Sequence, residues 1–235
     1  MSDTETLKRA AGLEAAGLVE AGMRIGLGTG STVAHFLLFL SERITRGGLR
    51  NVLGVPTSLW TAQKARDLGI PLTSLAEHPF LDLTIDGADE VGPAMNLIKG
   101  LGSALLREKM VAQASSRLAI IVDDAKVVDK LGRISPVPVE VVQFGWEVHD
   151  TFLESQGARP VVRRREDGQP LTTDNGNYII DCHFPDGIDD PDALDAALAS
   201  RAGIVESGLF LAMATEVIVG AKDGVRRSYA KPEAP

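Results

Sequence analysis

Polar residues follow several apolar segments of this chain, and the first such group could bind a phosphate. It is the segment 26–32, GLGTGST, which comes after a predicted strand and before a predicted helix. Glycines let backbone N–H groups turn toward an anion, the hydroxyls of Thr29, Ser31 and Thr32 add donors, and the helix presents its positive end. The same residues are also typical of a tight strand-to-helix turn capped by Ser or Thr.

This segment matches neither of two common nucleotide-binding motifs. The dinucleotide motif requires a third glycine where Ser31 stands, and the nucleotide P-loop requires a Gly-Lys pair followed by Ser or Thr, which the segment lacks. The sequence therefore argues against NAD and ATP as ligands.

A second group, residues 86–90 (DGADE), places carboxylates directly after the apolar segment 81–85. Such acids could accept hydrogen bonds from sugar hydroxyls and polarise them for ring opening, or they could bind a divalent cation. Asp and Gly also favour turns, so a solvated turn is the alternative interpretation.

The third group is the segment 99–109, KGLGSALLREK, a glycine turn that leads into a predicted helix. Lys99 lies in the turn, and Glu108 follows on the helix between Arg107 and Lys109. Glu108 could act as a base that abstracts a proton if it faces a pocket. A glutamate between basic residues on a helix is otherwise an ordinary surface charge pair.

The fourth group, Asp123, Asp124 and Lys126, follows the apolar segment 118–122. A lone lysine in a loop is usually solvated, so this group alone favours neither a structural nor a functional interpretation. The repetition is more informative, because the carboxyl ends of parallel strands share one edge of a sheet. We therefore expect the four groups to converge at that edge.

Other reactive arrangements are missing from the sequence. The histidines have no zinc-ligand spacing and no cysteine cluster accompanies them, so no metal site is expected. Neither Ser31 nor Ser103 stands in a Gly-x-Ser-x-Gly segment, which argues against a hydrolase nucleophile. The run 163–165 (RRR), beside Glu166 and Asp167, is more typical of a solvated turn than of a binding patch.

The first half of the chain has the pattern of an α/β layered sheet. Short apolar segments alternate with segments of helical period, as expected for parallel strands covered on both faces. The predicted strands are residues 23–27, 51–55, 81–85, 118–122 and 217–221. The predicted helices, with apolar residues spaced three and four apart, are 32–43, 58–68 and 102–114.

After residue 129 the pattern changes to that of a small α+β unit. Strands are predicted at 139–142 and 177–184, and helices near 146–154 and 191–201. The predicted domains are a main domain, residues 1–129 plus 207–235, and a smaller inserted domain, residues 130–206.

Composition limits the partners and the compartment. With 44% hydrophobic and 24% charged residues, the 235-residue chain is an ordinary globular mixture without a membrane-spanning apolar stretch. The net charge of −8 argues against nucleic acid and anionic membranes as partners. The polar N-terminus does not resemble a signal peptide, so we expect a cytoplasmic protein. Cys182 is the single cysteine, in an apolar run that predicts a buried, inert thiol.

Taken together, the four groups resemble the signature series of A-type ribose-5-phosphate isomerases in order and spacing. Later segments also resemble this family, namely 136–141 (PVPVEV), 173–177 (TDNGN) and 208–210 (GLF). The likeness covers about residues 7 to 229 and is strongest before residue 130.

The resemblance implies a fold and a reaction. We expect a Rossmann-like main domain, a smaller ferredoxin-like α+β domain, a homodimer or homotetramer, and no cofactor or metal. Glu108 would be the general base that moves a proton from C2 to C1 of open-chain ribose 5-phosphate through a cis-enediolate, giving ribulose 5-phosphate. Lys99 would stabilise the developing negative charge, and Asp86 and Asp89 would bind hydroxyls and assist ring opening.

The resemblance also implies which residues surround the sugar phosphate. They are Thr29, Gly30, Ser31, Thr32, Asp86, Gly87, Ala88, Asp89, Lys99, Gly100, Leu101, Gly102, Lys126 and Lys8.

Three departures from the family pattern bear on the site. Leu101 stands where the family usually has the middle glycine of three, and a left-handed backbone there would cost leucine about 1 kcal/mol or more. Pro56-Thr57 replaces a serine-rich stretch, and 211–215 (LAMAT) replaces a more polar segment. These departures bear on substrate preference and on subunit contacts.

Two other functional classes are compatible with a related fold. One is a non-catalytic sugar-phosphate sensor domain, although the chain has no room for a DNA-reading helix pair before its first strand. The other is a different enzyme, either an amino-sugar-phosphate isomerase, which would act on a hexose phosphate, or a CoA transferase, which would form a glutamyl thioester.

Overall fold

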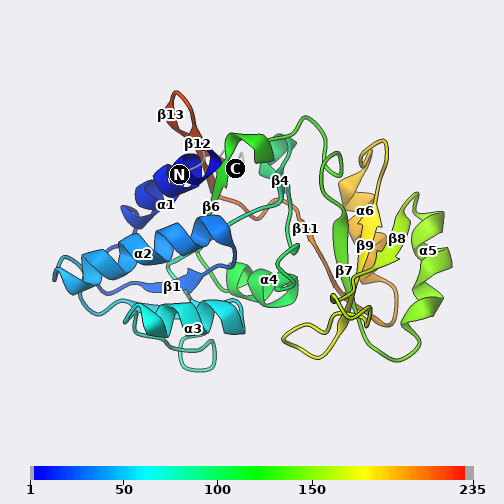
Figure 1. Cartoon of the computed structure of the whole chain (residues 1–235), viewed down its shortest axis with the longest axis horizontal. Helices are drawn as coiled ribbons and strands as arrows, with labels where there is room; N and C mark the ends of the chain where they lie inside the picture. The colour runs from blue at the N-terminus through cyan, green and yellow to red at the C-terminus, as the bar shows by residue number, and fades with distance from the viewer. Residues whose placement is uncertain (1–2, 231–235) are drawn as a thin grey trace, which may run out of the picture. The chain divides into compact units, whose positions relative to one another are not determined.

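The computed structural model describes residues 3–230, which form two compact units (Figure 1). The first unit contains the chain up to Ala88, Arg107–Lys126, and the chain from Met213 onward. The second contains Asp89–Leu106 and Val127–Ala212. Segment 89–106 thus groups with the second unit, whereas the sequence placed it in the main domain.

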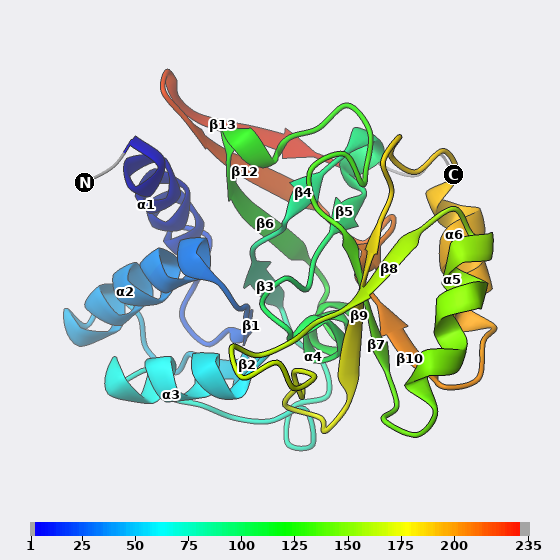
Figure 2. The same ribbon diagram turned by 45° about the vertical axis from the view of Figure 1, so that its right-hand side comes forward.

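A six-stranded sheet forms the centre of the first unit, in the order β13-β12-β6-β3-β1-β2. All neighbouring pairs are parallel except β12 and β13, which form an antiparallel hairpin that Figure 2 shows clearly. The strands are β1 (Arg24–Leu27), β2 (Leu53–Pro56), β3 (Leu83–Asp86), β6 (Leu118–Asp123), β12 (Glu216–Ala221) and β13 (Gly224–Tyr229). The five predicted strands are confirmed. The exposed strand β13, whose sequence GVRRSY is mostly polar, was not predicted.

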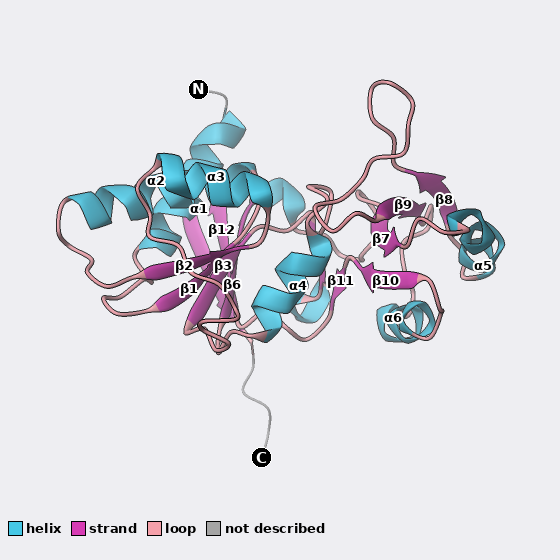
Figure 3. Cartoon of the chain, turned by 90° about the horizontal axis from the view of Figure 1, so that it is seen from below, coloured by secondary structure: helices cyan, strands magenta, loops and turns pink. Residues whose placement is uncertain are grey.

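Helices cover both faces of this sheet (Figure 3). On one face are α1 (Asp3–Ala16), α2 (Ser31–Thr45) and α3 (Leu59–Asp67), which share a buried core with side chains of β1, β3 and β6. On the other face is α4 (Leu105–Gln113). Its Val111 packs so closely on Gly26 of β1 that a Cβ added at Gly26 would overlap it. The three predicted helices are confirmed, whereas α1 was not predicted. Its buried face consists of Ala and Gly, a weak hydrophobic signal, and at Gly12 it lies directly against α2.

The second unit contains a four-stranded antiparallel sheet in the order β10-β7-β9-β8. Its strands are β7 (Val137–Val141), β8 (Arg159–Val162), β9 (Tyr178–His183) and β10 (Ile204–Ser207), and its helices are α5 (Asp150–Ser155) and α6 (Pro191–Ala199). The chain order β7-α5-β8-β9-α6-β10 with this strand order is the ferredoxin-like arrangement that was expected.

One face of this second sheet forms the core of the unit. Alternate residues of β7 and β9, including Val139 and Ile180, pack with Leu153 of α5 and Leu194 of α6. Cys182 belongs to the same face and is 1% exposed, and this burial raises the pKa of its thiol. The thiol is therefore protonated and inert at neutral pH, as the sequence indicated.

A third, three-stranded sheet in the second unit was not predicted. It has the order β11-β5-β4, from β11 (Leu209–Phe210), β5 (Leu97–Ile98) and β4 (Glu90–Val91). Such two-residue strands leave no period-2 pattern in a sequence, and β11 comes from a distant part of the chain to pair with β5. Lys99 follows β5, so the expectation that all four polar groups end strands of one parallel sheet was wrong for this group. Its strand belongs to the antiparallel sheet instead.

The described residues also form three short 3-10 helices: η1 (Pro93–Met95), η2 (Asp124–Lys126) and η3 (Trp146–His149). Within residues 3–230, no helix has the length and apolar character that a bilayer crossing requires.

Candidate functional site

The loop after β1 is joined to the end of β3 by a carboxylate. Oδ1 of Asp86 accepts hydrogen bonds from the backbone N–H of Thr29, at 3.0 Å, and of Gly87, at 2.7 Å. Asp86 is 1% exposed, and a Cβ at Gly28 would overlap its carboxylate. Glycine at 28 is thus required by the close approach of Asp86, and two of the predicted polar groups lie together.

The hydroxyl of Thr29 is the centre of a cluster that sequence reasoning did not identify. Its Oγ1 lies 2.8 Å from Thr57 Oγ1, 2.9 Å from Ser58 Oγ and 3.0 Å from Thr61 Oγ1. Ser58 also caps α3 by accepting from the N–H of Thr61. A Ser directly before an apolar helical pattern was a detectable capping signal, but the link to Thr29 depends on the pairing of β1 with β2.

The same loop leads into the N-terminus of α2. Gly30 precedes the helix with φ of 129°, a conformation that L-residues rarely adopt. Ser31 is exposed and Thr32 is 8% exposed in the first turn. The first N–H groups of a helix have no partner inside it, and they carry partial positive charge, so this end can receive a phosphate.

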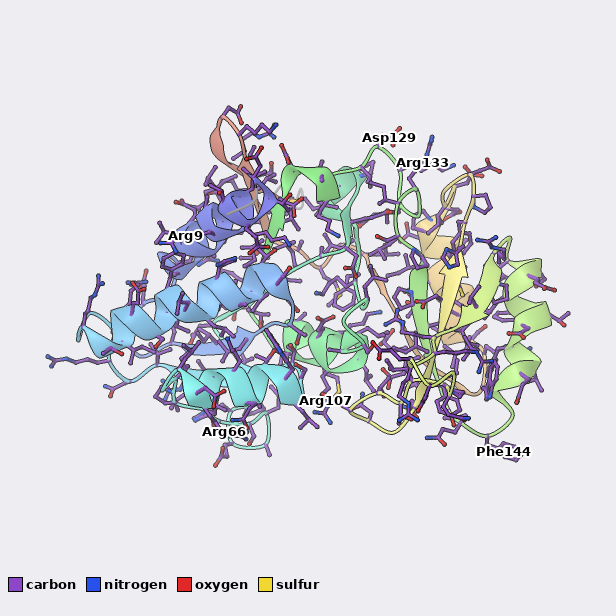
Figure 4. All side chains as sticks on the ribbon, in the orientation of Figure 1. Arg9, Arg66, Arg107, Asp129, Arg133 and Phe144 are labelled. Atoms are coloured by element: carbon purple, nitrogen blue, oxygen red, sulfur yellow. The ribbon has the colours of Figure 1, made fainter. Side chains whose placement is uncertain are left out.

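Glu108 lies in the first turn of α4 and is only 3% exposed. Its neighbour Lys109 is 6% exposed, whereas Arg107, labelled in Figure 4, is half-buried on the same helix. The surface charge pair that the sequence left open is therefore excluded, because neither Glu108 nor Lys109 is at the surface. A carboxylate so shielded from water has the setting that a proton-abstracting base needs.

In the second unit, Lys99 is held at the end of β5. It is buried, at 2% exposure, and its Nζ lies 5.4 Å from the ring centroid of Phe210. The backbone N–H of Lys99 donates to the carbonyl of Gly208 at 2.9 Å. Phe210 is fully buried. A buried ammonium above an aromatic face is a preorganised positive charge rather than a solvated lysine.

The glycine turn after Lys99 accepts leucine at position 101 without backbone strain. Among the described residues the left-handed positions of this turn are Gly100, with φ of 102°, and Ser103, with φ of 63°. Leu101 is not among them, so the cost considered for this departure does not arise. Its N–H donates to Oδ2 of Asp89 at 2.9 Å, which joins two further residues of the predicted site.

Arg163 is not part of a solvated turn, and that interpretation of the arginine run was wrong for this residue. Its side chain is 13% exposed and forms an ion pair with Asp181. It also donates to the carbonyls of Gly100 and Leu101 and to Ser103 Oγ. The interpretation holds for Arg164 and Arg165, which are exposed. The burial of Arg163 depends on tertiary packing, which a run of three arginines does not reveal.

The two other predicted lysines lie in the first unit. Lys126 ends η2, directly after β6, and is half-buried. Lys8 is on α1, where its Nζ lies 3.4 Å from Glu5, whose other oxygen is 3.0 Å from Nε2 of His35. Hydrogen bonds from His35 and Lys8 lower the pKa of Glu5.

The structure thus assembles the predicted site in two groups. The first unit contains residues 29–32 and 86–88, Glu108, Lys126 and Lys8, and the second contains Asp89 and the loop 99–102. Across residues 3–230, no three His, Cys, Asp or Glu side chains are grouped in a way that could hold a metal ion.

Comparison with known proteins identifies relatives across nearly the whole chain. A family model described as ribose 5-phosphate isomerase A (phosphoriboisomerase A) matches residues 53–224. A protein of Chloroflexus aurantiacus named ribose-5-phosphate isomerase A is 53% identical over 225 residues, which are 96% of this chain and 94% of the relative.

Solved structures agree with this match. A D-ribose-5-phosphate isomerase in complex with phospho-erythronic acid has a TM-score of 0.94 and 40% identity, covering 97% of this chain and 99% of that one. The ribose 5-phosphate isomerase of Plasmodium falciparum has a TM-score of 0.93 and 39% identity, with coverage of 97% and 99%.

Proposed function

Because the chain belongs to the ribose-5-phosphate isomerase A family, we propose that Glu108 is the general base with which it interconverts ribose 5-phosphate and ribulose 5-phosphate. The chain is an aldose-ketose isomerase whose substrate is a sugar phosphate. The observation that carries the assignment of the base is the burial of Glu108, at 3% exposure, in the first turn of α4.

The reaction requires a proton to move between adjacent carbons. In open-chain ribose 5-phosphate, the carboxylate of Glu108 removes the proton from C2, and the electron pair of that bond moves toward the C1 carbonyl to give a cis-enediolate. The hydroxyl proton on O2 passes to O1, the electron pair on O2 forms the C2 carbonyl, and the protonated Glu108 returns the first proton to C1, so that ribulose 5-phosphate results. One carboxyl group therefore acts first as base and then as acid.

The enediolate must be stabilised, because the C2 proton is otherwise too weakly acidic to be removed. We assign this role to Lys99, whose buried ammonium above Phe210 is a fixed positive charge. Asp86 and Asp89 bind sugar hydroxyls and assist ring opening. Residues 29–32, Lys126 and Lys8 supply donors and positive charge for the rest of the ligand, with Gly87, Ala88 and residues 100–102 beside it.

The test is isomerisation of ribose 5-phosphate by wild type and Glu108→Gln in the presence of EDTA, with exchange of the C2 proton followed in deuterated solvent. We expect wild-type turnover to survive chelation, and the variant to lose both turnover and exchange by about 100-fold to 10,000-fold. Glu166→Gln is the matched control, because Glu166 is an exposed carboxylate in a turn and its loss should leave both rates unchanged.

Each alternative gives a different result. Full activity of Glu108→Gln would refute the assignment of the base. Activity lost on chelation and restored by a divalent cation would refute a metal-free reaction. Binding of sugar phosphate by wild type without turnover would favour the sensor function, turnover of an amino-hexose phosphate would favour the related isomerase, and a CoA-dependent glutamyl adduct would favour the transferase.

The assembly and the compartment remain predictions from the sequence. We propose a homodimer or homotetramer in the cytoplasm, with neither nucleic acid nor membrane as a partner, since the net charge is −8. Sedimentation of the purified chain would measure the oligomer directly.

A further inference from the structure

The guanidinium of Arg163 uses both of its edges inside the second unit. Along one edge, Nε and Nη2 donate to Oδ2 and Oδ1 of Asp181, the first at 2.9 Å. From the other edge, Nη1 donates to the carbonyl oxygens of Gly100 and Leu101, each at 3.0 Å, and to Ser103 Oγ at 2.9 Å. One side chain therefore contacts three of the four residues that follow Lys99.

The loop that Arg163 contacts has a conformation that needs support. Gly100 and Ser103 both have positive φ, and the Ser103 N–H donates to the Gly100 carbonyl at 2.9 Å to close the turn. The left-handed region is unfavourable for serine, so contacts outside the loop must stabilise it. Arg163 supplies these contacts from one side, and Asp89 supplies another through the Leu101 N–H.

The ion pair with Asp181 explains how the charged side chain of Arg163 can be largely buried beside the loop 100–103. The two side chains are 13% and 16% exposed, so the guanidinium would be costly to bury without its carboxylate. Asp181 alternates along β9 with the core residues Ile180 and Cys182, and therefore projects from the opposite face of the sheet. The rigid sheet thus fixes the guanidinium, and the guanidinium fixes the loop.

From this arrangement we propose that Arg163 is a positioning residue for isomerisation, which holds the loop 100–103 in the conformation that places Lys99. This inference rests on the proposed role of Lys99. The backbone of Lys99 is anchored on its N-terminal side by the Gly208 carbonyl, and the loop bound by Arg163 anchors its C-terminal side. Without the second anchor the ammonium loses its fixed place, although the residues expected to bind the phosphate are untouched.

The experiment compares Arg163→Lys with Arg164→Lys and Arg165→Lys. All three keep the charge and remove the planar fork, but residues 164 and 165 are exposed and their contacts lie within the turn, to Gly168 and Asp167. We expect Arg163→Lys to lower kcat by about tenfold to a hundredfold, since an ammonium cannot keep both the bidentate pair and the loop contacts. KM should rise by less than kcat falls, because the loop 100–102 is only part of the expected ligand surround, and the two controls should keep the wild-type kcat.

Two further readouts separate positioning from a general loss of stability. Amide hydrogen exchange should accelerate in a peptide covering residues 99–106 of Arg163→Lys and stay unchanged in the controls. Added guanidinium ion, at concentrations far below denaturing ones, should restore part of the kcat of Arg163→Ala but not of Lys99→Ala. A destabilised fold would show neither a local change in exchange nor rescue by guanidinium.

The outcomes distinguish this inference from the proposed function. If wild type does not turn over ribose 5-phosphate, the proposed function fails first. If wild type is active and Arg163→Lys keeps its kcat, or if Arg164→Lys loses as much, the positioning role is refuted. Should Arg163→Lys fail to fold, Asp181→Asn decides the question: a reduced kcat with faster loop exchange supports the role, and an unchanged kcat overturns it.

Discussion

The backbone nitrogen of Thr29 lies 3.0 Å from Oδ1 of Asp86, although 57 residues separate them in the sequence. Strands β1 and β3 are parallel neighbours, so the loop after one and the last residue of the other meet at the same edge of the sheet. The same oxygen accepts from the Gly87 N–H. Asp86 therefore organises two glycine loops, in addition to any hydroxyl that it binds.

This double role predicts different results for two substitutions of Asp86. Asp86→Asn keeps an acceptor oxygen for both N–H groups but loses the charge, so we expect a folded protein with reduced kcat/KM. Asp86→Ala leaves both N–H groups without this acceptor, and we expect it to lose about 1–3 kcal/mol of unfolding free energy as well. Urea unfolding and steady-state kinetics measure both effects, and equal stability of the two variants would contradict the structural role.

Glycine at position 28 is predicted to be indispensable for steric reasons. A methyl group there would overlap the carboxylate and the backbone of Asp86, so Gly28→Ala should destabilise the fold by about 1–3 kcal/mol and displace the Thr29 loop. Gly87→Ala is the stability control, because its added Cβ would find its nearest neighbour at 3.8 Å. Comparable thermal midpoints for the two alanine variants would show that Asp86 can move away from a Cβ at position 28 without loss of stability.

Glu90 is a buried carboxylate that we predict to be structural and not catalytic. It is fully buried, and its oxygens accept from the N–H groups of Gly132, at 2.7 Å, and of Ile134 and Ser135, each at 2.6 Å. In Glu90→Gln the hydrogen bonds lose their charge assistance, and the NH2 group of the amide faces at least one backbone N–H donor. We therefore expect the free energy of unfolding to fall by about 1.5–3 kcal/mol.

The corresponding control is Glu154→Gln on the exposed side of α5, which should change stability by less than about 0.5 kcal/mol. Denaturant unfolding of both variants provides the measurement. If Glu90→Gln is as stable as wild type but inactive, Glu90 belongs to the catalytic machinery instead.

His149 is predicted to make stability depend on pH in the mildly acidic range. The imidazole is 2% exposed, Nδ1 has no hydrogen-bond partner, and burial together with the nearby Arg201 lowers its pKa. The unfolded chain therefore takes up a proton that the folded protein does not. Stability contributed by neutral His149 is present above the ordinary histidine pKa of about 6.5 and is lost as the pH falls toward the lower folded value.

The measurement is the urea midpoint of wild type and His149→Gln between neutral and mildly acidic pH. We expect the midpoint of wild type to fall more steeply with acidification than that of the variant. The adjacent Asp150 has its pKa raised by burial, an effect of opposite sign, and His149 itself lowers the pKa of Asp150, so the difference between the two proteins measures the contribution of the pair. Parallel profiles would show that His149 does not titrate on unfolding.

The parallel sheet and its glycine loops could be predicted because their signals are local. Each strand from β1 to β6 in the main sheet is a short apolar run, and the GLGTGST and DGADE segments stand at strand ends in the sequence itself. Helix α1 and strand β13 escaped prediction because one buries only small residues and the other buries none. Helix α1 is held by its packing against α2, and β13 is held by hairpin pairing with β12, so the place of each depends on a partner element and not on its own apolar pattern.

The sequence by itself determined the fold class, the family and the chemical inventory of the site: a glycine loop, carboxylates, Lys99 and Glu108. It did so because periodicity, turn residues and ordered motifs are properties of neighbouring residues. Only the tertiary structure decided which charges are buried, since burial depends on what packs against a side chain. It placed Glu108 and Lys99 out of water, assigned the left-handed backbone to Gly100 and Ser103 instead of Leu101, and brought Arg163 against that loop.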